Sequence, residues 1–119
     1  MNFCKLSIVL VLTLGGLSFS CEDDDDTSGA SNISCNGVVV GFAADVKPII
    51  DSRCATSSGC HGSGSNVGPG ALTTYTQVFQ ARTQIKTAVS SGIMPKGSSL
   101  NTGEKASIVC WIEGGAANN

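Results

Sequence analysis

Two cysteines and a histidine lie close together in the middle of the chain, in an order that could attach a haem covalently. Cys54 and Cys60 are separated by five residues, and His61 follows Cys60 directly. In proteins with such a motif, the thiols add across the two haem vinyl groups and the adjacent histidine becomes the proximal iron ligand. The usual gap between the cysteines is two residues. The longer gap here requires a bulge, which the small residues 57–59 would allow.

A haem iron with a protein ligand on each side needs a second donor, and the sequence offers Met94. His61 is the only histidine, and Met94 is the only methionine besides Met1. A thioether sulfur is a suitable iron ligand, and Pro95 restricts the loop that carries it. The alternative is that Met94 simply covers apolar surface, as isolated methionines commonly do. Because no acid–base group other than His61 accompanies the motif, we expect electron transfer and no enzymatic activity.

Hydrophobic periodicity predicts a helix that leads into the motif. We expect this helix to begin near Asp45 as its N-cap, with Pro48 in the first turn. Its apolar face consists of Val46, Ile49, Ile50 and Cys54. The first cysteine would therefore sit at the buried end of a helix.

A second helix is expected after the glycine-rich loop that follows the motif. Thr73 or Thr74 would cap it, it would stop by Gly92, and near Arg82 it could divide into two shorter helices. Its apolar positions are Val78, Ala81, Ile85, Ala88 and Val89.

The last predicted helix begins at Asn101, which with Glu104 fits a variant of the capping box. It ends at Gly114 and Gly115. Its apolar face consists of Ile108, Val109 and Ile112. No strand pattern of useful length is present, so the predicted fold class is all-α.

The first 36 residues read as targeting and tether segments. An apolar run after Lys5 is typical of a signal sequence over residues 1–20, being too short for a lasting membrane span. Cys21 follows small residues as in a bacterial lipobox, which predicts lipidation and attachment to a membrane surface; the alternative is ordinary cleavage near Ser20. Residues 21–36, which include the acidic run 22–26, would form a flexible tether. Residues 37–119 would form one domain.

The charge of the chain is unevenly distributed. The formal net charge is −2, yet the five consecutive acidic residues 22–26 account for more than that, and the domain beyond them has a small positive charge. So few basic residues cannot form the dense basic surface of a nucleic-acid-binding protein, so we expect no nucleic-acid partner. In an exported protein, the cysteines are expected to persist as disulfides, thioethers or metal ligands.

The chain resembles small class I c-type cytochromes, especially the single-haem domains of bacterial lipoproteins. The resemblance spans about residues 42–119. The matching segments are Asp45–Ile50, Cys54 with Cys60-His61-Gly62, Leu72–Tyr75, Gly92-Ile93-Met94-Pro95-Lys96-Gly97, and Ile108 with Trp111–Ala116. It implies a fold in which the first and last helices cross. It also implies one haem c with thioethers from Cys54 and Cys60 and axial ligands His61 and Met94.

The same resemblance implies a disulfide between Cys35 and Cys110, tying the entry segment to the last helix. The alternative pairs Cys54 with Cys35 or Cys110 and leaves Cys60 as the single thioether. The expected partner is a redox protein or a membrane electron-transport complex. The lipid anchor would place the domain at the outer membrane, in the periplasm or at the cell surface.

Two other function classes compete with a cytochrome. A structural zinc site could use Cys54, Cys60, His61 and one further cysteine. It would leave Met94-Pro95 without a role and one thiol unpaired in an oxidising compartment. A disulfide-stapled binding module without a cofactor would pair Cys54 with Cys60 and Cys35 with Cys110.

Overall fold

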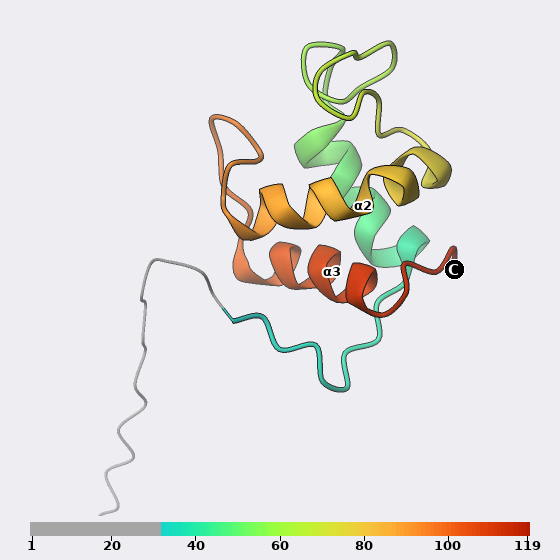
Figure 1. The fold of residues 1–119 in the computed structure, drawn as a ribbon, viewed down its shortest axis with the longest axis vertical. Helices are drawn as coiled ribbons and strands as arrows, with labels where there is room; N and C mark the ends of the chain where they lie inside the picture. Colours follow the sequence, from blue (N-terminus) through green and yellow to red (C-terminus); the bar gives the residue numbers. More distant parts are fainter. Residues whose placement is uncertain (1–31) are drawn as a thin grey trace, which may run out of the picture.

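The computed structural model describes residues 32–119, and within this range every regular element is helical (Figure 1). A continuous helical run, called the first helix below, consists of η1 (Phe42–Val46), α1 (Lys47–Ile49) and η2 (Ile50–Cys54). It is followed by α2 (Tyr75–Ser90) and α3 (Thr102–Glu113). The predicted all-α class is confirmed for this part of the chain.

The first helix starts at Phe42, and its N-cap is Gly41 rather than Asp45, four residues earlier than predicted. The carboxylate of Asp45 accepts a hydrogen bond from the Gly41 N–H at 2.8 Å, so it stabilises the helix start from inside the first turn. Asn119 supplies two further acceptors: its side-chain oxygen for the Phe42 N–H at 2.9 Å and its backbone oxygen for the Ala43 N–H at 2.8 Å. The end of the chain therefore satisfies donors that the helix itself leaves unpaired.

Helix α2 is one uninterrupted helix, so the predicted division near Arg82 is wrong. Thr74 is its N-cap and forms a complete capping box with Gln77. The Arg82 guanidinium lies 4.0 Å from the centre of the Phe79 ring and donates to the Phe79 carbonyl at 2.7 Å. The side chain that suggested a break therefore folds back along the helix and covers it.

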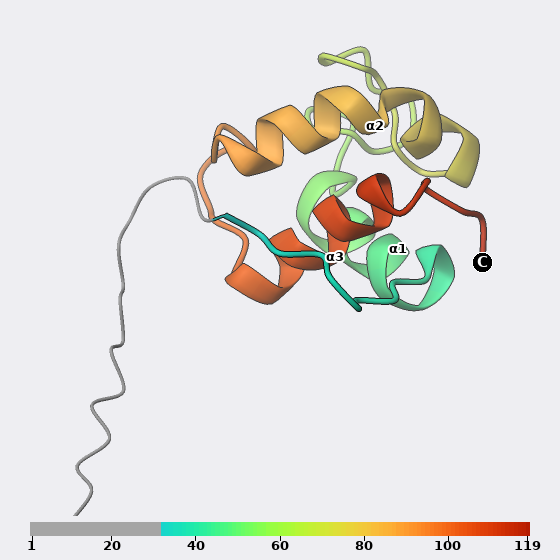
Figure 2. The ribbon, with the colours of Figure 1, turned by 60° about the horizontal axis from the view of Figure 1, so that its bottom comes forward.

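Helix α3 begins and ends as predicted, with the Asn101–Glu104 capping box and the Gly114 C-cap. Its buried face is broader than predicted, because Cys110 and Trp111 are buried beside Ile108 and Val109, while Ile112 is only partly buried. Helix α3 packs against both α2 and η1 (Figure 2).

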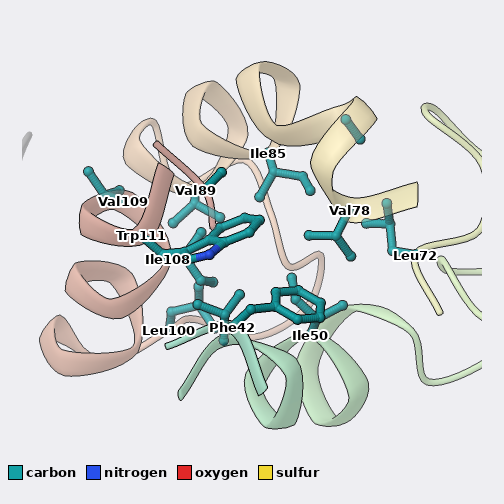
Figure 3. Close-up of a cluster of buried hydrophobic side chains, with 13 residues drawn as sticks. Phe42, Ile50, Leu72, Val78, Ile85, Val89, Leu100, Ile108, Val109 and Trp111 are labelled. Atoms are coloured by element: carbon teal, nitrogen blue, oxygen red, sulfur yellow. The ribbon is translucent and has the colours of Figure 1, made fainter. Parts of the chain in front are cut away.

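The core is organised around an aromatic group at the meeting point of the three helices (Figure 3). The Phe42 ring lies 5.3 Å from the Trp111 ring and 5.1 Å from the Tyr75 ring, centre to centre. The segment after α3 accepts from both polar aromatics: Trp111 Nε1–H donates to the Ala117 carbonyl and the Tyr75 hydroxyl to the Ala116 carbonyl. The buried Trp111 donor and the partly buried Tyr75 donor are thus both satisfied.

A disulfide between Cys35 and Cys110 joins the entry segment to α3, with the two Cα atoms 5.2 Å apart. This is the pairing implied by the cytochrome resemblance, and it is confirmed. Cys54 and Cys60 are free thiols. The alternative pairings of Cys54 with Cys35 or Cys110 are therefore wrong in this structure.

The predicted signal sequence, the lipidation site Cys21 and the acidic run of the tether lie outside the described residues. Between residues 32 and 119, no helix combines the length and the apolar character that crossing a membrane requires.

Candidate functional site

The five residues between the two cysteines form a compact turn at the end of η2. The Cys60 N–H donates to the Ser57 carbonyl at 3.0 Å, and the His61 N–H returns to the Cys54 carbonyl at 3.0 Å. Residues 56–59 are exposed, so the extra length bulges into solvent. His61 is thereby brought back next to the helix end that carries Cys54.

Gly62 permits the closest backbone approach in this turn. Its N–H donates to the Ser57 carbonyl at 2.7 Å, and a Cβ atom at position 62 would lie 2.7 Å from both the carbon and the oxygen of that carbonyl. No other contact at this position is as short, and backbone atoms cannot move aside as a flexible side chain could. The motif therefore requires glycine directly after the histidine.

Replacing Gly62 with alanine is expected to destabilise the domain by about 1–3 kcal/mol, the usual range for overpacking a filled site. Gly59 offers a matched control in the same turn, because a Cβ atom there would meet only the Ser57 hydroxyl at 3.7 Å. Denaturant unfolding of Gly62→Ala and Gly59→Ala measures the difference. Equal stability of the two variants would contradict the close approach.

The His61 side chain is buried, with 8% of its surface exposed, and it is held in one orientation. Its Nδ1 lies 2.9 Å from the Gly70 carbonyl oxygen, and its own backbone carbonyl accepts from the Leu72 N–H at 2.8 Å. A carbonyl can only accept, so Nδ1 carries the proton in this bond, and in the neutral imidazole the lone pair is then on Nε2. Second-shell bonds of this type fix the tautomer of metal-binding histidines and raise their basicity.

The two free thiols have opposite environments. Burial raises the pKa of the Cys54 thiol to about 11, and the nearby Cys60 and Glu104 add to the shift. Cys60 is exposed, and hydrogen bonds from the Thr56 and Ser57 side chains lower the pKa of its thiol. Because the thiolate is the nucleophilic form, Cys60 is the more reactive of the two.

A cavity of about 310 Å³ brings together the four residues that the sequence predicted as a site: Cys54, Cys60, His61 and Met94. A second cavity of about 120 Å³ is lined by Cys54, His61 and Met94 as well. Its other walls are mostly apolar, with Leu72, Pro69 and three apolar residues of α2, namely Ile85, Ala88 and Val89, beside the polar Gln84. Cys54, His61 and Met94 therefore lie between the larger, partly polar cavity and the smaller, mostly apolar one.

Met94 enters this site from the loop that joins α2 to α3. Its backbone N–H donates to the Ala88 carbonyl at 3.2 Å, which ties the loop to the last turns of α2. The Met94 side chain is half-buried, and the following Pro95 is buried. The loop is therefore anchored on both sides of the thioether.

Charged groups hold the end of η2 against the start of α3 beside the larger cavity. Arg53 Nε donates to Glu104 Oε1 at 2.9 Å, and the same carboxylate accepts from the Asn101 N–H through its other oxygen. These bonds lower the pKa of Glu104, the Asn101 backbone contributing most. Lys96, on the opposite loop, also lines this cavity.

The four candidate donors line one cavity. In the range 32–119, no group of three or more His, Cys, Asp or Glu side chains is placed to hold a metal ion directly. The predicted zinc alternative therefore lacks its ligand set there. The candidate donors and the mostly apolar walls of the adjoining cavity fit the chemistry of a flat, largely apolar cofactor.

Sequence reasoning missed the groups that orient the histidine. Gly70 acts through its carbonyl, and only the Gly68-Pro69-Gly70 turn signal could have drawn attention to it. Ser65 is buried in the same loop, and no sequence pattern marked it.

The chain matches no family model, no curated protein and no solved structure.

Proposed function

We propose that this protein is a class I c-type cytochrome that carries single electrons with one covalently attached haem. The observation that carries the proposal is the shared cavity: two free thiols, a buried histidine with Nε2 available and a methionine all line it. When bound, haem c supplies a one-electron Fe(III)/Fe(II) couple. The protein's own contribution is to hold this group, ligate it and exclude water.

Each donor has a distinct role in this proposal. Cys54 and Cys60 form the thioethers, His61 is the proximal ligand through Nε2, and Met94 is the distal ligand. Methionine is a soft donor that favours reduced iron and raises the reduction potential relative to a second histidine. With Nδ1 donating to the Gly70 carbonyl and Nε2 bound to the iron, His61 would have no ring nitrogen left for acid–base catalysis. The proposed function is therefore electron transfer, in which no substrate undergoes a chemical reaction.

The helical arrangement supports the finer fold assignment. The first helix packs on α3 through Phe42 and Trp111, as expected for the crossing first and last helices of a cytochrome c-like domain. The cavity lies between the end of the first helix, α2 and the Met94 loop. The end of the first helix, α2, the loop after the motif and the Met94 loop would therefore enclose the cofactor.

The proposed partner is another redox protein or a membrane electron-transport complex. We propose that the exported domain is held at a membrane surface by a lipidated Cys21, on the periplasmic or outer face of the cell envelope. Nucleic acid is not a proposed partner, because three of the six basic side chains in the domain are paired with carboxylates.

Expression in a host with haem-attachment machinery tests the function directly. The expected product is coloured, with the mass of one haem added to the intact chain and an absorption band for two saturated vinyl groups. A colourless product with a Cys54–Cys60 disulfide would favour the stapled binding module. A colourless product with stoichiometric zinc would favour the structural metal site.

Replacing Met94 with alanine is expected to leave haem attached but open the sixth coordination position. The reduction potential should fall, and the ferrous protein should bind carbon monoxide, because the soft distal donor is lost. The matched control is Ile93→Ala, since the neighbouring Ile93 side chain is 64% exposed and does not line either cavity. If Met94→Ala keeps the parent spectrum and potential, Met94 only packs in its loop.

A further inference from the structure

Ser65 is the one buried side chain besides His61 that is polar within the described domain, and it lies at the base of the loop after the motif. Only 7% of its surface is exposed. Its hydroxyl donates to the Cys60 carbonyl and accepts from the Val67 N–H at 3.2 Å. Ser65 therefore joins the residue before the histidine to the far part of the loop.

The same loop ends at the group that orients the imidazole. The Gly70 N–H donates to the Val67 carbonyl at 3.0 Å, and the Gly70 carbonyl accepts from His61 Nδ1 at 2.9 Å. A path of hydrogen bonds, joined through the backbone of Val67 and Gly70, thus runs from the Cys60 carbonyl through Ser65 to the His61 ring. The Ser65 hydroxyl is the only side-chain link in the path between Cys60 and Gly70.

We infer that Ser65 is a positioning residue for His61: it holds the loop so that the Gly70 carbonyl keeps the Nδ1 proton and Nε2 faces the cavity. This inference rests on the proposed function for its redox consequence, since a firmer Nδ1 hydrogen bond makes Nε2 a stronger donor to iron. Removing the hydroxyl leaves the Cys60 carbonyl and the Val67 N–H without their partner. The loop then loosens at its base, and the Gly70–His61 bond is made less often.

Three variants isolate this effect in the full chain. Ser65→Ala removes the hydroxyl, Ser65→Thr restores one, and Ser63→Ala removes an exposed hydroxyl from the same loop as the matched control. Because His61 is the only histidine, its ring nitrogen resonances in ¹⁵N NMR are unambiguous. We expect the Nδ1 proton to exchange about fivefold faster in Ser65→Ala. This factor corresponds to the loss of one hydrogen bond of ordinary strength, here the bond from Nδ1 to the Gly70 carbonyl. Ser65→Thr and Ser63→Ala should match the parent.

The haem-loaded protein provides the second readout. Ser65→Ala should raise the reduction potential, because weaker donation from Nε2 stabilises ferric iron less. Unchanged Nδ1 exchange and potential in a haem-loaded Ser65→Ala would overturn the inference while leaving the cytochrome proposal intact. Faster Nδ1 exchange in a chain that takes up no haem would support the positioning role and refute the cytochrome.

A measurement on the unmodified chain tests the same coupling if Ser65→Ala does not accumulate as a folded protein. If Ser65 couples the loop to the ring, the Val67 and Gly70 amide protons and the His61 Nδ1 proton should share one protection factor in hydrogen exchange. Independent exchange of the Nδ1 proton would contradict the coupling.

Discussion

Replacing His61 with alanine is expected to reduce covalently attached haem to background. His61 is the only histidine in the sequence, and its imidazole is buried beside both thiols, so no second imidazole can take its place. Without the proximal ligand, the reactive groups of a haem are no longer held against the exposed Cys60 thiol. The absorption spectrum and the intact mass of the purified chain measure the loss.

Gln84→Ala provides the matched control for this prediction. Gln84 lines the apolar cavity with His61, but its side chain is exposed and donates to none of the described groups. It should therefore leave haem content unchanged. The thiol count of His61→Ala shows whether the Cys35–Cys110 bridge, and hence the fold, has formed. A fully loaded His61→Ala with the parent spectrum would refute the ligand assignment.

Replacing Cys35 and Cys110 together with alanine is expected to lower the free energy of unfolding by about 4 kcal/mol. The bridge closes a loop across a sequence separation of 75 residues, and the chain-entropy model gives this magnitude for such a loop. Alanine is preferable to serine because Cys110 is buried and a hydroxyl there would lose its hydration. Denaturant unfolding of the parent and the double variant measures the difference.

Reductant distinguishes the disulfide from simple packing. The parent should lose about the same stability in dithiothreitol as the double variant loses by mutation. The double variant itself should be insensitive to reductant, because thioethers and free thiols are not reduced. Equal stability of the parent with and without reductant would show that the bridge contributes little.

The residues that line the candidate site were largely predictable because their choice depends on residue types and on neighbours in sequence. Cys60 and His61 are adjacent in the chain, so their proximity needs no tertiary information. The Asn101–Glu104 capping box was also local, since both partners lie within one turn. The same holds for Thr74 at the start of α2. Such contacts are set by the backbone over three or four residues.

The tertiary structure decided where the first helix begins. Asp45 is a good N-cap by type, but the helix extends back to Phe42, whose ring packs between Tyr75 and Trp111. Asn119, far away in the chain, accepts from the first helical N–H groups. Burial of an aromatic side chain and two hydrogen bonds from a distant residue outweigh a local capping preference of about 1 kcal/mol.

Only the folded chain could show how the histidine is oriented. The sequence determined that His61 is the available imidazole and that Met94 is the available thioether. That Gly70 supplies the acceptor depends on a backbone carbonyl, which leaves no trace in residue type, and the partners of the Ser65 hydroxyl are backbone groups as well. The Cys35–Cys110 pairing was likewise one of several open choices until the entry segment was placed against α3. Local patterns specify which groups can react, whereas long-range packing specifies which of them meet, because contacts between distant segments follow from the burial of the whole core.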